Sequence, residues 1–595
     1  MHRHHGFLIF ILTIMGTFAS AITEAKDFYV TEAKDFYVDP TSGSASGDGS
    51  AANPWKSLQA VIDSGLVETR VWESLPYDDT KQLVPKNAAA PIKAGDTIYL
   101  RSGYHGELNI SSHYNSAEIT IAAQSGQTPR FKAVLLRSSS HWRIVGISVS
   151  AEFAPVYEQK MLMALESHAY SGPIHDIVVE GCQLRSVADI STWAAADWSN
   201  KACNGISASG SKITLRGNVL KNVNFGLSVS ARDSLVERNL VENFAGDGMR
   251  GLGDHTVFQY NTIKNCYDVD DNHDDGFQSW SVGADGQVGT GEVVGIVLRG
   301  NTFINYEDPN QPLRGPLQGI GCFDGTFVDW VIENNVVIVD HFHGITLLGA
   351  KNCKIVNNTV LDPNGETPGP PWIRIGSHKD GTAPDNCVVG NNLAQSFNNE
   401  GVGVTEDHNI QYSVPDDHFV DVARYDLHLK ESSSAVNAGA FQWAPPADIE
   451  GVARPQGAEV DVGAYEWTDS PPTPDASVAD LGGVQDGALP SHDAGVARDL
   501  ATGDLATGDL ATGDLATGDL ATGDLATGDL ATGDLAIGDL AIGDLATGDT
   551  SPRGELRAGC SCDASGAGGG ALAFGLLLAL WVRTRRCQTC QRESE

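Results

Sequence analysis

Short runs of apolar and β-branched residues recur through the middle of the chain, and each run ends in asparagine. The asparagines that close these runs are Asn218, Asn239, Asn261, Asn301, Asn335, Asn358 and Asn392. Several of the intervals between them are 21 to 23 residues, which is typical of a solenoid whose coils contain short strands. An asparagine at the same turn of every coil can bond to the backbone of the next coil and tolerates left-handed geometry. The pattern predicts an all-β parallel β-helix.

A second repeat supports the first. A glycine followed by an apolar residue occurs once in each coil, at Gly205, Gly226, Gly248, Gly276, Gly319 and Gly344. We expect the apolar residue to point into the core, and the next residue to point outward, because side chains alternate along a strand. Two coils are lengthened, by insertions within residues 249–275 and 277–318. Insertions in a solenoid collect on one face and commonly form its binding site.

The alternation predicts two outward rows of side chains. The first row is Ser207, Ser228, Arg250, Gln278, Gly321 and Thr346, and the second is Ser209, Ser230, Leu252, Trp280, Phe323 and Leu348. Coils stack about 4.8 Å apart, so Arg250, Gln278, Trp280 and Phe323 should form one patch. Exposed aromatic rings beside an amide and a cation suit a sugar ring, which makes Gln278, Trp280 and Phe323 candidate substrate-binding residues. Packing of the two rings under the inserted loops is the alternative.

The densest polar segment runs from Asp268 to Gln278, where six carboxylate or amide groups fall within eight residues. So many polar groups cannot all be buried without partners. The candidate ligands of a Ca²⁺ ion are Asp270, Asp271 and Asp274. Such an ion would neutralise a uronate carboxylate and acidify the proton at C5. Arg250 or His273 would remove that proton, and the glycosidic bond would break by β-elimination.

Two other interpretations remain open for this segment. Asp247 and Asp275, which precede glycines on neighbouring coils, could be the acid and the base or nucleophile of a glycoside hydrolase. Repulsion between two carboxylates at such a short distance would raise the pKa of one of them, as a general acid requires. The segment could instead be a solvated acidic loop or a structural calcium clamp in a non-catalytic, glycan-binding adhesin. A polysaccharide lyase is the first expectation, ahead of the hydrolase and the adhesin.

Further candidates lie on neighbouring coils. His343 shares the position before the glycine with Asp275 and can face the groove, or it can be a structural histidine. Arg314, in the long insertion, could hold a substrate carboxylate or pair with a local aspartate. The segment 372–379, with Arg374, His378 and Lys379, could close the far end of the groove.

The chain divides into four regions by composition. Residues 1–21 resemble a secretory signal peptide, with a short apolar run before Ala-Ser-Ala, and residues 22–468 form the predicted β-helix domain. Residues 469–556 contain the repeat Leu-Ala-Thr-Gly-Asp and read as an extended, self-repelling linker. Residues 557–595 contain an apolar run followed by arginines, which is a stop-transfer pattern. We expect a secreted monomer on the cell surface, held to the membrane by this C-terminal anchor.

The formal net charge of −37 argues against a nucleic-acid partner, since nothing would neutralise phosphates. An acidic exported protein can instead hold divalent cations. The cysteines of the body, Cys182, Cys203, Cys266, Cys322, Cys353 and Cys387, lack the short paired spacing of a zinc site. Buried thiols or one or two disulfides are expected there.

The two ends of the body resemble a known family. The segments 36–59 and 94–106 look like the N-terminal cap and first coil of pectate-lyase-like right-handed β-helix proteins. The segment 448–467 is similar to the closing segment of anchored bacterial members, and the C-terminal tail resembles the sorting tails of myxobacterial surface proteins. The resemblance implies a right-handed parallel β-helix with a polysaccharide partner. It does not imply a reaction, because this fold hosts lyases, hydrolases, epimerases and adhesins.

Overall fold

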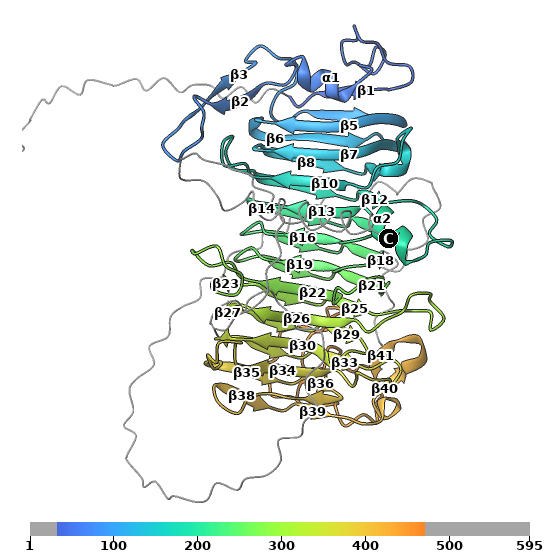
Figure 1. Cartoon of the computed structure of the whole chain (residues 1–595), viewed down its shortest axis with the longest axis vertical. Helices are drawn as coiled ribbons and strands as arrows, with labels where there is room; N and C mark the ends of the chain where they lie inside the picture. Colours follow the sequence, from blue (N-terminus) through green and yellow to red (C-terminus); the bar gives the residue numbers. More distant parts are fainter. Residues whose placement is uncertain (1–31, 470–595) are drawn as a thin grey trace, which may run out of the picture. The chain divides into compact units, whose positions relative to one another are not determined.

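In the computed structural model, which describes residues 32–469, the chain forms a right-handed parallel β-helix (Figure 1). A regular coil contains three short strands, and each strand pairs in parallel with the equivalent strand of the next coil. The equivalent strands build three ladders, called here the first, second and third ladder. This arrangement confirms the fold predicted from the asparagine and glycine repeats.

The ladders run through most of the described residues. The first ladder contains β5 (Gly103–Ser111), β7 (Pro129–Arg137), β10 (Met161–Glu166), β13 (Asn204–Ala208), β16 (Leu227–Val229), β19 (Met249–Gly251), β22 (Asp275–Trp280), β26 (Gln318–Asp324), β30 (His343–Leu348), β34 (Trp372–Gly376) and β37 (Ser396–Phe397). The second contains β1 (Asp35–Val38), β4 (Thr97–Leu100), β6 (Tyr114–Ala123), β8 (Ser140–Val145), β11 (His175–Glu180), β14 (Ser211–Arg216), β17 (Leu235–Glu237), β20 (Val257–Gln259), β24 (Val297–Arg299), β28 (Val331–Glu333), β32 (Lys354–Val356), β35 (Cys387–Gly390) and β38 (Val404–Asp407). The third contains β9 (Ser148–Ser150), β12 (Gln183–Arg185), β15 (Val219–Val223), β18 (Leu240–Phe244), β21 (Thr262–Cys266), β25 (Thr302–Ile304), β29 (Val336–Ile338), β33 (Thr359–Leu361), β36 (Leu393–Ala394) and β39 (Ile410–Gln411).

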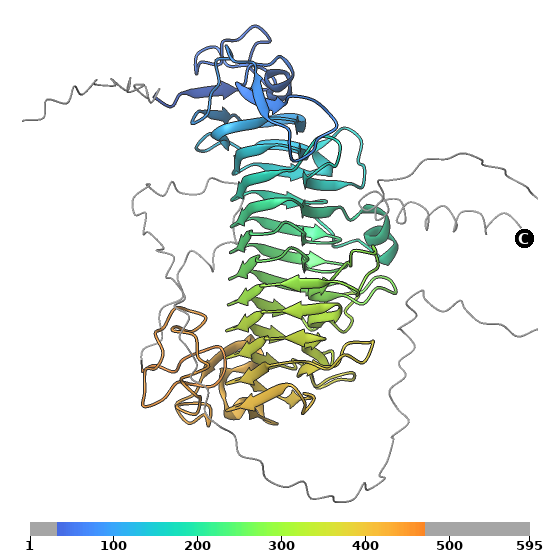
Figure 2. The ribbon, with the colours of Figure 1, turned by 90° about the vertical axis from the view of Figure 1, so that its left-hand side faces the viewer.

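The other elements cap or flank the coils. They are α1 (Leu58–Asp63), the antiparallel pair β2 (Thr69–Trp72) and β3 (Leu83–Lys86), α2 (Ala195–Lys201), the small parallel sheet of β23 (Glu292–Val294), β27 (Thr326–Val328) and β31 (Ala350–Lys351), and the antiparallel pair β40 (Phe419–Asp421) and β41 (Asp426–Leu429). The segment after β39 folds back beside the last coils (Figure 2). There Asn357 Nδ2 donates to the carbonyl of Asp461, so the closing segment is tied to the β-helix.

Inward side chains from all three ladders build the core. The residues that follow the repeated glycines are all buried and stand opposite one another in the first ladder: Ile206, Leu227, Met249, Phe277, Ile320 and Ile345. Ile373, which follows Trp372, continues the same buried row. The glycines themselves are required by close approach of the coils. A Cβ on Gly226 would lie 2.2 Å from the carbonyl oxygen of Gly248. The glycine therefore recurs once per coil in the sequence because the next coil approaches too closely for a side chain at that position.

The predicted asparagine ladder is present and continuous. Each Nδ2 donates to the Oδ1 of the next ladder asparagine, and that same Oδ1 accepts from the backbone N–H, as from Asn261 to Asn301 at 2.9 and 3.0 Å. The ladder extends one step beyond the prediction, to Asn409. The left-handed residue is not the ladder asparagine but the one before it, as at Arg238 and Tyr260. The asparagine side chains thus stay inside the helix, where they satisfy buried backbone groups.

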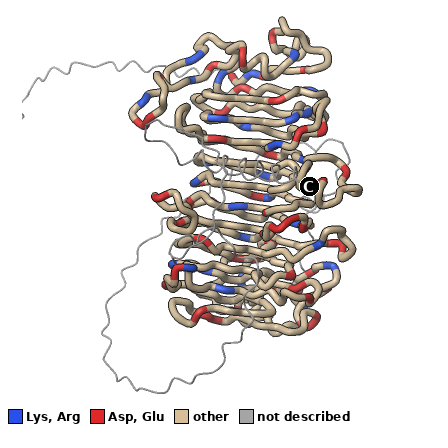
Figure 3. Tube along the Cα trace, in the orientation of Figure 1, with Lys and Arg blue, Asp and Glu red and all other residues tan. Residues whose placement is uncertain are grey.

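The outer face of the second ladder carries opposite charges on successive coils. Arg216 pairs with Glu237, and Arg299 pairs with Glu333. Figure 3 shows acidic and basic residues interspersed over the coils. The six cysteines of the described part are all buried free thiols. This agrees with the first of the two states predicted for them.

Several predictions fall on the ends of the chain. The signal peptide, the anchor and the linker beyond residue 469 lie outside the described residues. Between residues 32 and 469, no helix combines the length and the hydrophobicity needed to cross a membrane.

Candidate functional site

The first ladder brings the predicted outward row into register. Ser207, Ser228, Arg250, Gln278, Gly321 and Thr346 stand opposite one another on successive strands, and Arg374 continues the row. The residues before the glycines form a parallel column beside this row. In that column the backbone N–H of Gly248 donates to the carbonyl of Asp275, which pairs in turn with Gln318.

Arg250 is held from three sides. Its Nε is ion-paired with Oδ2 of Asp247, whose side chain is buried. Its guanidinium lies 3.8 Å from the ring centre of Phe225 on the preceding coil and 5.4 Å from that of Trp280 on the following coil. A cation enclosed between two aromatic faces and a carboxylate is fixed in position, and planar guanidinium groups suit binding of a carboxylate.

Asp247 has no free oxygen for chemistry. While Oδ2 pairs with Arg250, Oδ1 accepts from the backbone N–H of Asp275 at 3.2 Å. Burial raises the pKa of Asp247, and Arg250 opposes that shift. The predicted pair of Asp247 and Asp275 therefore comes together, but Asp247 is engaged as a structural partner of Arg250 rather than as a free nucleophile or acid.

His273 and Asp275 form a dyad next to this ion pair. Nδ1 of His273 lies 3.0 Å from Oδ2 of Asp275, which also accepts from Nε2 of Gln278 at 3.1 Å. Asp275 is fully buried, whereas the His273 side chain is 55% exposed. The hydrogen bond that His273 donates to Asp275 raises the pKa of His273 to about 8. Burial raises the pKa of Asp275, and the bond with His273 opposes that shift. Nε2 of His273 has no hydrogen-bond partner among the described residues, and its side chain is exposed.

Two buried acceptor oxygens at this point have no donor in the described part of the chain. They are Oδ1 of Asp275 and Oε1 of Gln318, which belong to paired residues on adjacent coils. Oδ1 of Asp275 lies over Gly321, where a Cβ would come within 2.2 Å of it and 2.9 Å of the Phe323 ring. The absence of a side chain at residue 321 therefore makes room for the carboxylate. Buried acceptors without donors are costly, so this position is suited to a hydroxyl or water donor.

One of the predicted aromatic residues, Phe323, lies outside its predicted row. Phe323 was predicted in register with Trp280, and this is wrong, because a bulge between β22 and β26 places Asp324 opposite Trp280. Phe323 instead turns over Gly321, and its ring centre lies 4.7 Å from that of His343. It remains beside Asp275, in a group of rings on the next coils rather than in the predicted row.

His343 belongs to this aromatic group. Its ring contacts Phe323 and Trp372, and its Nδ1 lies 3.0 Å from Oγ1 of Thr346, which also accepts from Nε1 of Trp372. Burial lowers the pKa of His343 to about 3, so the ring is neutral at physiological pH. These contacts favour the structural alternative for His343.

The acidic segment does not assemble the predicted calcium site. Asp270 and Asp271 are exposed, and Asp270 accepts from the backbone N–H of Asn272. Asp274 is buried, bonded to Asn272 and Cys266, and burial raises its pKa to about 8, which leaves it neutral at pH 7. In residues 32–469, no group of three close metal-ligating side chains includes these aspartates. Calcium binding by this segment therefore stays a prediction.

Arg314 lies apart from the Arg250 group. Its guanidinium is 4.5 Å from the ring centre of Tyr306 and is ion-paired with Glu366 at 3.4 Å. His378 and Lys379 are likewise paired, with Asp380 and Asp324. The ion pair of Arg314 matches the alternative expected for it, and Arg374 continues the first row.

Sequence reasoning missed three contributors: Phe225, Gln318 and Trp372. Phe225 and Gln318 occupy the column before the glycines, in register with Asp247 and Asp275. Trp372 continues this column opposite His343, although Ile373 and not a glycine follows it. The column was visible in the glycine repeat, since Phe225 and Gln318 directly precede Gly226 and Gly319. The sequence did not predict their contacts with the site, because these contacts depend on the direction in which each side chain turns. Two pockets of the described part, of about 410 and 620 Å³, lie elsewhere on the molecule.

Comparison with known proteins supports the fold. A family model described as "Right handed beta helix region" matches residues 196–366. No curated protein matches. Similar solved structures include the pectate lyase Pel9A, with 14% identity, a TM-score of 0.37 and coverage of 73% of this chain and 96% of that one. A lacto-N-biosidase from Eubacterium ramulus has 12% identity, a TM-score of 0.32 and coverage of 64% and 68%. A rhamnogalacturonan lyase has 12% identity, a TM-score of 0.30 and coverage of 65% and 91%. With TM-scores below 0.5 and identities of 12 to 14%, these likenesses assign no activity to this chain.

Proposed function

We propose that the protein is a carbohydrate-active enzyme that cleaves an acidic polysaccharide by β-elimination at the His273–Asp275 dyad. The observation that carries the proposal is the position of Arg250, fixed by Asp247, Phe225 and Trp280 one coil away from that dyad. Elimination requires a cation that binds the uronate carboxylate and a base beside it. Arg250 and the imidazole of His273 supply these two groups.

In the proposed reaction, Arg250 binds the carboxylate of the sugar and stabilises the negative charge that develops on it. Nε2 of His273 removes the proton from C5, and Oδ2 of Asp275 stabilises the resulting imidazolium. The C4–O4 bond breaks, a double bond forms between C4 and C5, and water protonates the departing oxygen. Gln278, whose side chain is half-buried, provides a partner for a sugar hydroxyl.

Elimination is favoured over hydrolysis by the state of Asp247. A glycoside hydrolase needs two available carboxyl groups, and both oxygens of Asp247 are bonded to Arg250 and to the backbone of Asp275. Export and anchoring at the cell surface belong to the same proposal, since they would give the enzyme access to an extracellular glycan.

The test is to incubate the full chain with a panel of polyuronides and record the absorbance of unsaturated uronate. His273→Gln and Arg250→Gln should lose at least about 100-fold in rate, as expected for loss of a general base or of charge stabilisation. His408→Ala, which also removes a histidine bonded to an aspartate, should keep the parental rate. Reducing ends without that absorbance would indicate hydrolysis. Binding without cleavage, equal in parent and His273→Gln, would indicate an adhesin and would overturn the proposal.

A further inference from the structure

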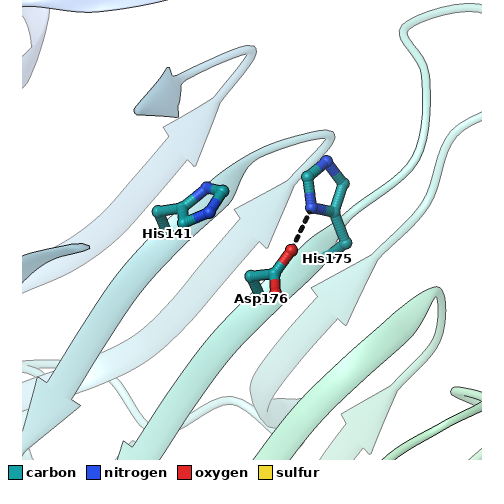
Figure 4. A group of neighbouring side chains, drawn as sticks. All are labelled: His141, His175 and Asp176. Atoms are coloured by element: carbon teal, nitrogen blue, oxygen red, sulfur yellow. Dashed lines mark hydrogen bonds and ion pairs between the residues drawn. The ribbon is translucent and has the colours of Figure 1, made fainter. Parts of the chain in front are cut away.

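A second cluster of chemically competent side chains lies on the second ladder, outside the site described above. His141 follows the first residue of β8, and His175 and Asp176 begin β11 on the next coil. One potential ligand atom of each residue lies within 4.8 Å of the other two. Among residues 32–469, this is the only group of three metal-ligating side chains that is so close. Figure 4 shows the two imidazoles and the carboxylate converging from adjacent strands.

We propose that His141, His175 and Asp176 bind one divalent transition-metal ion of the Zn²⁺ type. Two imidazoles and one carboxylate are the ligand types that such an ion prefers. The ligands come from two coils, so the ion would also join β8 to β11. The proposal is independent of the reaction proposed for the first ladder.

The hydrogen bonds of the cluster are compatible with metal binding. Nδ1 of His141 lies 3.0 Å from Oγ of Ser140, a contact that orients the ring and leaves Nε2 for the ion. Burial lowers the pKa of His141, which favours the neutral imidazole that a metal needs. Nδ1 of His175 lies 2.6 Å from Oδ2 of Asp176. Two ligands on one zinc ion lie about 3.3 Å apart, so binding replaces the proton shared by this pair and requires only a small side-chain rotation.

The surroundings indicate an open site rather than a closed structural one. His141 and Asp176 line the pocket of about 620 Å³, together with Glu118, Lys212 and Asp233. Three protein ligands leave at least one coordination position for water or for an oxygen of a bound molecule. Glu118 on the preceding coil and Lys212 line the same pocket, and Arg70 acts electrostatically on His141.

The test measures metal content directly. The full chain, purified without an added histidine tag, is equilibrated with Zn²⁺, separated from free metal and analysed for zinc per chain. Asp176→Asn and His175→Ala should each bind one ion fewer than the parent. His408→Ala should bind the same number as the parent, because it removes an equivalent 2.6 Å histidine–aspartate contact that has no third ligand. Histidines near the N-terminus and cysteines near the C-terminus are common to all variants, so the difference reports this cluster alone.

Two further measurements distinguish loss of zinc binding from loss of folding. Far-UV circular dichroism verifies that each variant retains its β-sheet signal. Zn²⁺ should raise the melting temperature of the parent and of His408→Ala but not of Asp176→Asn, because a ligand stabilises only the state that binds it. Equal zinc content in the parent, Asp176→Asn and His175→Ala would overturn the proposal. Because the readout does not involve a glycan, it can fail or succeed without bearing on the proposed elimination.

Discussion

The substitution Gly321→Ala tests the geometry of the candidate site with a single methyl group. The φ of Gly321 lies outside the left-handed region, so an alanine is compatible with the backbone. Its Cβ would nevertheless lie 2.2 Å from Oδ1 of Asp275 and 2.9 Å from the ring of Phe323. An ordinary van der Waals contact is at least 3.4 Å, so the carboxylate must move by about 1 Å, and the His273 hydrogen bond moves with it. A displacement of that size at a catalytic group costs about 100-fold in rate.

The assay is elimination by Gly321→Ala compared with the parent, with Gly401→Ala as the control. Gly401 has nothing within 4 Å of its would-be Cβ and no left-handed φ, so its substitution should leave the rate unchanged. Overpacking at residue 321 should also lower the free energy of unfolding by about 1–3 kcal/mol. A parental rate in Gly321→Ala would show that the position of Asp275 is irrelevant to activity, and the assignment of the dyad would be refuted.

The remaining predictions concern pH, calcium and stability. If neutral His273 is the base, kcat/KM should rise with pH and level off above about 8, since Asp275 raises the pKa of His273 to about 8. In Asp275→Asn the rise should shift to lower pH, towards the ordinary histidine value, and an unmoved profile would exclude this role. The calcium chelator EGTA should leave elimination unchanged, whereas a loss restored by Ca²⁺ would show that the acidic segment rearranges around the ion. Asn301→Ala removes four buried hydrogen bonds and leaves the backbone N–H of Asn261 without an acceptor. Urea denaturation should therefore show a free energy of unfolding lower by about 3 kcal/mol. Asn409→Ala, at the half-buried end of the ladder, should cost about 1 kcal/mol, because water replaces its bonds. Equal losses in these two variants would contradict the role of burial.

The position of the residues along the coils could be predicted because a solenoid makes tertiary contacts nearly periodic in sequence. The asparagine interval gave the coil length, and the glycine gave the strand phase, so the outward row from Ser207 to Thr346 was correct at every step. Even the long insertion between Asn261 and Asn301 did not disturb the ladder, because the inserted residues loop away from the paired strands. Periodicity of this kind is absent from most folds, in which contacts depend on long-range packing.

Side-chain partners were decided by the tertiary structure alone. The bulge after Ser279 removed Phe323 from the predicted row, and no residue pattern announces a bulge of one residue. The acidic segment was expected to converge on a metal, but among the described residues no close group of three metal-ligating side chains includes its aspartates. The sequence by itself determined which residues share a face, since the period of the coil and the alternation of the strand are local properties. Only the three-dimensional structure decided which atoms meet, because rotamers, bulges and burial depend on neighbours many residues away in the chain.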